Sequence, residues 1–112
     1  MRSFREPYPF GSSRAALAPL PSDHVDPVVL AANVSQARPV PAGAQYVVFS
    51  FDGDFYARFG ESAAIAAAVP GASATNGQGS ELNPAARRIP AGLTHIALIA
   101  DAPRKGSLAF YA

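Results

Sequence analysis

Two segments of the chain combine apolar, strand-forming residues with the same tripeptide, Pro-Ala-Gly. The first is VPAGAQYVVFSFDGDFYARFG, residues 40–60, and the second is IPAGLTHIALIADAPRKGSLAFYA, residues 89–112. β-Branched and aromatic residues are enriched in strands, whereas Gly, Pro and Asp interrupt strands and mark turns. The pattern therefore predicts two copies of one unit, a turn followed by a β-hairpin.

The first predicted hairpin is centred on Asp52-Gly53. An Asp-Gly pair between apolar runs is typical of a two-residue type I′ turn, so we expect residues 45–51 to pair with residues 54–59 as antiparallel strands. One face of this hairpin would carry Val47, Phe49, Phe51 and Tyr56. The opposite face is apolar as well, whereas a hairpin with one face in water alternates apolar and polar residues. We therefore expect one face to form the core and the face with these four residues to contact a partner.

The Pro-Ala-Gly tripeptides predict tight turns. Proline suits the second position of a β-turn and glycine is common at the fourth. This assignment places Pro41 and Pro90 at the second position and Gly43 and Gly92 at the fourth.

The rest of the pattern predicts further short strands. Residues 28–35 predict one strand, and residues 93–100 and 107–111 predict the second hairpin. Residues 61–69 are rich in alanine, which favours a helix, but they also alternate like a strand, so we expect a strand or irregular structure. Residues 72–88 predict a loop. Together these elements predict an all-β fold, either a small antiparallel β-sandwich or a jelly-roll-like barrel.

Residues 1–27 are rich in proline and show little periodicity. Such a segment is extended and does not pair as a central strand. A disordered terminus is one interpretation, but the aromatic residues of this segment are unusual for a disordered linker. We therefore divide the chain into an extended N-terminal arm, residues 1–27, and a β-sandwich domain, residues 28–112. The arm residues expected to bind a partner are Arg2, Phe4, Arg5, Tyr8, Phe10 and Arg14.

The composition indicates that the domain depends on neighbours for stability. Of the 112 residues, 49% are hydrophobic and only 15% are charged. Small domains bury a modest fraction of their surface and are usually stabilised by disulfides, a metal or a partner chain. The sequence contains no cysteine, and its low charge leaves apolar surface to be covered. We therefore expect a homo-oligomer.

The sequence contains none of the common catalytic or metal-binding patterns. His24 and His95 lie far apart and lack the spacing of metal ligands. No Gly-x-Ser-x-Gly motif is present. Asp52, Asp54 and Glu61 are the residue type of paired carboxylates in glycoside hydrolysis, but Asp52 is explained by the turn. The net charge of +1 gives no basic patch for nucleic acid, and no apolar run is long enough to cross a membrane. We expect no enzyme activity, no catalytic residue, no metal and no cofactor.

Three motifs within residues 39–112 resemble those of a known group of proteins. They are the Pro-Ala-Gly unit with FSFDGDFYARF after it, GSELNP at residues 79–84, and the closing LAFYA at residues 108–112. These motifs are similar to those of small β-rich proteins encoded among the structural genes of tailed bacteriophages. The resemblance implies a virion component and brings no catalytic or binding residues with it. Residues 1–35 lie outside the match.

On this resemblance we expect a non-enzymatic virion structural protein, namely a capsid decoration (cement) or minor capsid protein assembled in the host cytoplasm. Its partner would be the major capsid protein or another virion structural protein, contacted through the hairpin face and the arm. The alternative is a glycan-binding β-sandwich module of a phage fibre or tail tip. An exposed groove with Tyr or Phe rings would favour the glycan-binding module, whereas a flat apolar patch beside an ordered arm would favour the structural protein.

Overall fold

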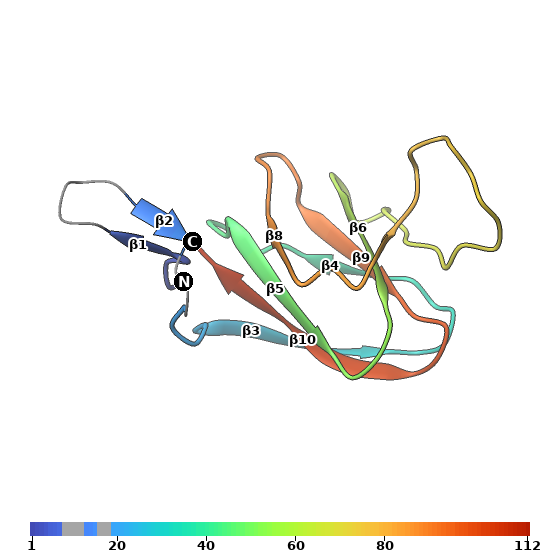
Figure 1. The fold of residues 1–112 in the computed structure, drawn as a ribbon, viewed down its shortest axis with the longest axis horizontal. Helices are drawn as coiled ribbons and strands as arrows, with labels where there is room; N and C mark the ends of the chain where they lie inside the picture. Colours follow the sequence, from blue (N-terminus) through green and yellow to red (C-terminus); the bar gives the residue numbers. More distant parts are fainter. Residues whose placement is uncertain (8–12, 16–18) are drawn as a thin grey trace.

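The computed structural model of the chain describes residues 1–7, 13–15 and 19–112. Two four-stranded antiparallel sheets pack against each other, and a two-stranded ribbon lies beside them near the chain termini (Figure 1). The described residues contain no helix that could cross a membrane. Their only regular elements are strands, so the predicted all-β fold class is confirmed.

The strands have the following bounds. Sheet 1 contains, in spatial order, β3 (His24–Leu30), β10 (Arg104–Tyr111), β5 (Tyr46–Phe51) and β8 (Ala86–Arg88). Sheet 2 contains β4 (Gln36–Pro39), β9 (His95–Ile99), β6 (Tyr56–Gly60) and β7 (Glu81–Leu82). The separate ribbon consists of β1 (Arg5–Pro7) and β2 (Ser13–Ala15).

The strand order is that of one long hairpin rolled over on itself. β3 pairs with β10, β4 with β9, β5 with β8 and β6 with β7. The rolling also brings β10 against β5 and β9 against β6. As a result, the half from β3 to β6 and the half from β7 to β10 have equivalent places. Sheet 1, read as β3, β10, β5 and β8, corresponds to sheet 2 read as β7, β6, β9 and β4.

The two local hairpins predicted from the sequence are wrong. β5 and β6 lie in different sheets, as do β9 and β10, so Asp52-Gly53 crosses from one sheet to the other. Neither residue has the positive φ that a type I′ turn requires. The corner is held instead by Lys105: the Asp52 amide donates to the Lys105 carbonyl over 3.1 Å, and the Lys105 amide donates to the Asp52 carboxylate over 3.1 Å. These contacts between distant segments override the local turn signal.

The Pro-Ala-Gly tripeptides do form turns, but each turn lies one residue later than predicted. The amide of Ala44 donates to the carbonyl of Pro41 over 3.1 Å, and the second copy makes the equivalent bond over 3.3 Å. Proline is therefore the first residue of each turn and glycine the third. Gly43 has a φ of 84° and Gly92 a φ of 93°. A type II turn requires a positive φ at its third residue, so the glycine sets the position of the turn.

Most apolar side chains are buried between the two sheets. The core cluster contains Val28, Leu30, Val47, Phe49, Phe55, Ala57, Ile89, Ile96, Leu98, Ala100, Leu108 and Phe110. Both sheets and both halves of the chain contribute to it. No polar or charged residue with a described side chain is buried, so removal of apolar surface from water is the main force that holds the sheets together.

A second apolar cluster lies on the outer face of sheet 2, beneath residues 61–69. It consists of Tyr56, Ile65, Ala67, Val69, Ala97 and Ile99. The covering segment forms neither a helix nor a strand. Of the two predicted alternatives, a strand or irregular structure, the second is confirmed. It is fixed in part by the amide of Ala67, which donates to Ser35 Oγ over 3.0 Å. β9 thus carries apolar residues on both faces because one face meets the core and the other meets the chain's own segment.

Several element boundaries differ from those predicted. β3 begins at His24 and ends at Leu30, so it starts within the segment assigned to the arm and ends before residue 35. The predicted loop of residues 72–88 contains β7 and β8. These edge strands have two and three exposed residues, which is too few to produce an alternating pattern in the sequence.

Candidate functional site

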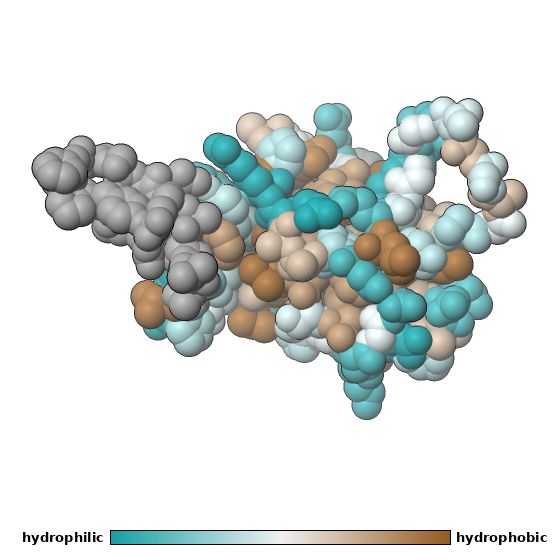
Figure 2. Space-filling view, viewed as in Figure 1, coloured by the Kyte–Doolittle hydropathy of each residue, from teal (hydrophilic) through white to brown (hydrophobic). Residues whose placement is uncertain are grey.

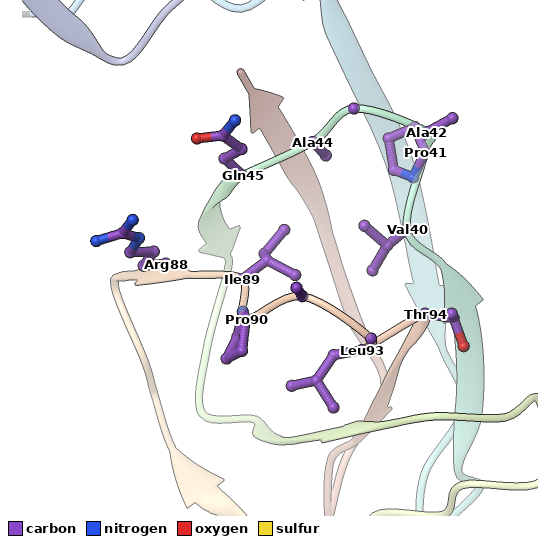
Figure 3. A pocket seen from close by; sticks show the side chains of 13 residues that line it. Val40, Pro41, Ala42, Ala44, Gln45, Arg88, Ile89, Pro90, Leu93 and Thr94 are labelled. Atoms are coloured by element: carbon purple, nitrogen blue, oxygen red, sulfur yellow. The ribbon is translucent and has the colours of Figure 1, made fainter.

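A groove lies between the two Pro-Ala-Gly turns, where the two halves of the chain meet (Figure 3). Its volume is about 800 Å³, and its lining consists of residues 40–45 from one half and residues 88–94 from the other. Each wall therefore contains one turn with the residues that flank it. The groove is a direct consequence of the repeat recognised in the sequence.

Two equivalent hydrogen bonds fix the walls of the groove. The amide of Val40 donates to the carbonyl of Thr94 over 2.8 Å, and the amide of Ile89 donates to the carbonyl of Gln45 over 2.7 Å. Each bond joins the residue before one turn to the residue after the other turn. The groove is consequently preformed by backbone contacts and does not depend on the placement of long side chains.

The lining of the groove suits binding better than catalysis. Arg88 is the only charged residue in it, and it contains no aromatic ring and no carboxylate. The one hydroxyl, of Thr94, lies 2.8 Å from Nδ1 of His95. General acid–base or nucleophilic catalysis needs a proton-transferring group beside a reactive one, and the lining offers no such pair directed at the groove. An apolar or anionic group is the ligand that these walls fit.

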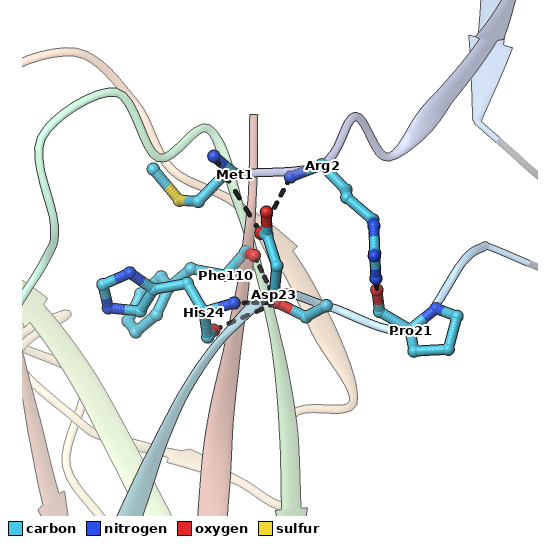
Figure 4. A network of polar contacts seen from close by, with 7 residues as sticks. Met1, Arg2, Pro21, Asp23, His24 and Phe110 are labelled. Atoms are coloured by element: carbon cyan, nitrogen blue, oxygen red, sulfur yellow. Dashed lines mark hydrogen bonds and ion pairs between the residues drawn. The ribbon is translucent and has the colours of Figure 1, made fainter.

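Two of the predicted arm residues contact the same chain. The ring of Phe4 stacks on Tyr46 at 5.0 Å between centroids and meets the edge of Tyr111 at 5.3 Å. Its amide donates to the carbonyl of Ala112 over 3.2 Å. The amide of Arg2 donates to Asp23 Oδ1 over 3.1 Å, and its guanidinium donates to the carbonyl of Pro21 (Figure 4). These contacts differ from the expectation that Phe4 and Arg2 lie against a partner.

The other arm residues are placed less fully. Arg5 lies in β1 and Arg14 in β2, and the two strands pair antiparallel. Tyr8 and Phe10 lie outside the described residues. Figure 1 shows this ribbon to one side of both sheets, next to the chain termini. The partner contacts predicted for these four residues stay predictions.

The four predicted hairpin-face residues do not share one exposed face. Val47 is fully buried and Phe49 is 6% exposed, both within the core between the sheets. Phe51 packs on Phe55 with the ring centroids 4.3 Å apart. Tyr56 belongs to the cluster on the outer face of sheet 2. The predicted register put them together, and it is wrong because β5 and β6 are in different sheets.

β8 brings two arginines to the edge of sheet 1, and sequence reasoning assigned no role to either. Arg87 is paired with Glu81, and the hydrogen bond from Arg87 lowers the pKa of the Glu81 carboxyl below its ordinary value. Arg88 has no ion pair with any described residue. The repeat contained a usable signal, because Arg88-Ile89-Pro-Ala-Gly aligns with Pro39-Val40-Pro-Ala-Gly in the strand before the first turn.

The remaining titratable clusters are structural. His24 Nε2 lies 3.4 Å from Asp26, and its ring meets the edge of Phe110. Asp54 accepts a hydrogen bond from the side-chain amide of Asn83 over 2.8 Å. Across the described ranges, no three His, Asp or Glu side chains gather in a way that could hold a metal ion.

Comparisons with known proteins add no relative to this description. No protein-family model matches the chain, no curated protein matches its sequence, and no solved structure matches its fold.

Proposed function

We propose that this protein is a non-enzymatic structural protein of a tailed-phage virion, either a capsid decoration protein or a minor capsid protein. The observation that carries the proposal is the strand order. Eight strands in two antiparallel sheets, paired as one rolled hairpin, fit the double-sheet jelly roll, an architecture of viral capsid and lectin domains. Because a fold by itself does not fix a function, the motifs in residues 39–112 that resemble phage structural proteins are the second support.

The ribbon of β1 and β2 also supports a role in assembly. It belongs to neither sheet, and an isolated two-stranded ribbon is marginally stable in water. Packing against a neighbouring subunit would stabilise it. A virion offers many identical neighbours at high local concentration, so a small domain gains stability there by mass action.

Exposed apolar side chains supply surface for such contacts. Each of the following apolar side chains is at least half exposed: Leu20, Val25, Val29, Val34 and Leu82. In Figure 2 apolar patches interrupt the hydrophilic surface over the two sheets. In the proposed assembly these patches meet the major capsid protein, another virion protein or a second copy of the chain.

The jelly-roll strand order also occurs in lectins, which keeps a glycan-binding module of a fibre or tail tip as the second candidate. Sugar-binding sites commonly stack a ring on the sugar face and add polar groups. The groove between the turns contains no aromatic residue. The two rings that line the smaller cavity beside β8, Phe4 and Tyr46, stack on each other, so these linings favour the structural role over the glycan-binding role.

Purified virions of the encoding phage test the proposal. Quantitative mass spectrometry of density-purified particles should find the chain in fixed proportion to a symmetric structural protein, and nuclease or salt washing should not remove it. An abundant host cytoplasmic protein serves as the control for contamination. If infected cells contain the chain and the purified particles lack it, the proposal is wrong. Binding of the isolated chain to host surface polysaccharide would favour the glycan-binding module instead.

A further inference from the structure

β8 leaves two backbone amides at the open edge of sheet 1. The amide of Ile89 donates to Gln45 over 2.7 Å, and the amide of Phe49 donates to Ala85 over 2.9 Å, so residues 85 and 89 face β5. In an antiparallel pair, successive residues direct their backbone groups to opposite sides. Ala86 and Arg88 therefore present their amides and carbonyls away from β5. The carbonyl of Ala86 accepts a hydrogen bond from Nη1 of Arg87 over 2.7 Å, so the amides of Ala86 and Arg88 are the main groups that this edge offers. β8 is the last strand of its sheet, so no described strand pairs with that side.

The equivalent edge strand of sheet 2 is closed by proline. β4 occupies the place in sheet 2 that β8 occupies in sheet 1. The amide of Val40 donates to Thr94, so by the same alternation Pro39 faces outward. Proline has no amide hydrogen and prevents the pairing of a further strand. Arg88 stands at the position equivalent to Pro39, and it supplies the donor that Pro39 lacks.

The other edge of sheet 1 is closed in the same way. The amide of Asp52 donates to the carbonyl of Lys105, and the amide of Gln45 donates to the carbonyl of Tyr111. The backbone groups of the odd-numbered residues of β10 therefore point towards β5. The even-numbered residues of β10 point their backbone groups towards β3, where they pair with even-numbered residues such as Val28. Pro27 therefore lies at an outward position of β3. The open edge of β8 is itself short, because Pro84 and Pro90 stand at the next outward positions on either side.

The surface beside this edge has a defined chemistry. A cavity of about 220 Å³ is lined by Phe4, Tyr46, Ala86, Arg87 and Arg88. Phe4 and Tyr46 make its apolar floor by stacking. Arg87 is neutralised by Glu81, which leaves Arg88 as a cation without an ion pair among the described residues. A segment bound along β8 would meet an apolar cavity and one positive charge on the same face.

We propose that the open edge of β8 binds an extended, acidic segment of a partner protein by strand addition. Backbone groups of the segment pair with Ala86 and Arg88, a carboxylate pairs with Arg88, and an apolar side chain two residues away occupies the cavity beside Phe4. Strand addition takes its affinity from backbone hydrogen bonds and its specificity from alternate side chains. The proposal deepens the proposed function, since it rests on that function for a neighbouring subunit that supplies the segment.

Two short peptides test the proposal on the full-length chain. The probe is acetyl-Thr-Leu-Thr-Glu-Thr-amide, which places an apolar and an acidic side chain on one face of a strand. The control peptide replaces Glu with Lys. NMR titration of the 15N-labelled chain should show shifts centred on the amides of Ala86 and Arg88 with the Glu peptide, and binding at least threefold weaker with the Lys peptide.

Two substitutions at one position separate charge from backbone pairing. Arg88→Gln keeps the amide and removes the charge, so affinity for the Glu peptide should fall about two- to fivefold, as for an exposed ion pair. Arg88→Pro removes the amide as well and should abolish the shifts. The fold should tolerate it because Pro39 occupies the equivalent position. Arg58→Gln, on β6 in sheet 2, is the matched control for net charge and should bind like the parent.

Several results would overturn the proposal. One is that the amides of Ala86 and Arg88 do not shift at millimolar Glu peptide. Another is that a folded Arg88→Pro variant binds the Glu peptide as well as the parent does. A third is that the parent binds the Lys peptide as tightly as the Glu peptide. The test uses the free chain, so its failure leaves the virion test of the proposed function intact. Conversely, peptide binding by a chain that purified virions lack would reject the virion role and keep the binding site.

Discussion

The two sheets have equivalent strand orders and differ in what covers their outer faces. On sheet 2, residues 61–69 lie over the outer face and bury an apolar cluster. On sheet 1, the described contacts cover one end only, where Phe4 packs on Tyr46. Along β3, Val25 is 50% exposed and Val29 is 65% exposed.

In this difference, the outer face of sheet 2 contributes to folding, whereas the outer face of sheet 1 is left for binding. Antiparallel sheets are stable with one face in water, so sheet 1 does not need a second cover to fold. Its apolar outer residues and the open edge of β8 are then available to partners. Sheet 2 has the outer face of β9 and part of that of β6 covered by residues 61–69 and a proline on its β4 edge, while Leu82 on its β7 edge stays 54% exposed. We therefore propose that the partner contacts are made mainly by sheet 1.

The largest expected effect is the substitution of Gly106 in β10, at the centre of sheet 1. A Cβ there would collide with the backbone carbonyl of Ser50 and the ring of Phe51. Relief requires separating β10 from β5, so Gly106→Ala should lower the free energy of unfolding by about 3 kcal/mol. In sheet 2, a Cβ on Gly60 would meet only the side chain of Ile65, and Gly60→Ala should cost about 1 kcal/mol. Urea denaturation measures both, and the reverse order would contradict the described packing.

The cover of sheet 2 should be sensitive to charge. Ala67 is 5% exposed in the apolar cluster, and a carboxylate there has no partner to offset its desolvation. Ala67→Asp should cost about 2 kcal/mol and increase self-association, because the outer face of sheet 2 becomes exposed. The neighbouring exposed Ala66 gives the control, and Ala66→Asp should stay within about 0.5 kcal/mol of the parent. Sedimentation and denaturation that fail to distinguish the two variants would show that the segment does not cover the sheet.

The two turns should respond alike, since the halves are equivalent there. Gly43 and Gly92 both have positive φ. A Cβ on Gly92 meets no atom within 4 Å, and one on Gly43 would make only an ordinary van der Waals contact with Met1 Cε at 3.8 Å. Gly43→Ala and Gly92→Ala should each cost about 1–2 kcal/mol for conformational reasons alone. Asn tolerates this conformation better, so the two Asn variants should cost less than the Ala variants. A large difference between the two positions would mean that the turns are not equivalent.

The smallest expected effect is at Gly53. It has no positive φ, and a Cβ there would meet only the movable end of Arg104. Gly53→Ala should therefore change the free energy of unfolding by less than about 0.5 kcal/mol. A type I′ hairpin at Asp52-Gly53 would predict a clear loss instead, so thermal and urea unfolding of this variant discriminate the rolled hairpin from the local one.

The sequence predicted the strands better than their pairing. The β-branched and aromatic residues at 45–51 predict a strand, and the structure has one at Tyr46–Phe51. The Asp52-Gly53 signal was misleading, because turn propensity is local and the competing contacts to Lys105 come from the other end of the chain. A strand that is apolar on both faces can bury its second face against a partner protein or beneath another segment of the same chain. Only the position of residues 61–69 decides between them.

The candidate site was predicted only in outline. The repeated Pro-Ala-Gly motif pointed to two equivalent turns, and these turns form the groove. Nothing local marked β8, because its three residues are exposed and follow a loop-like stretch. The contact of Phe4 with Tyr46 also joins residues that no sequence pattern relates.

Hydrogen exchange on virions tests the central claim, that the outer face and the β8 edge of sheet 1 face partners and the face of sheet 2 beneath residues 61–69 does not. The chain is compared free in solution and bound to purified particles, with exchange read out by mass spectrometry. The account predicts additional protection over β8 and β3 in the bound chain and no change over residues 61–69. Additional protection over residues 61–69 with none over β8 would contradict it.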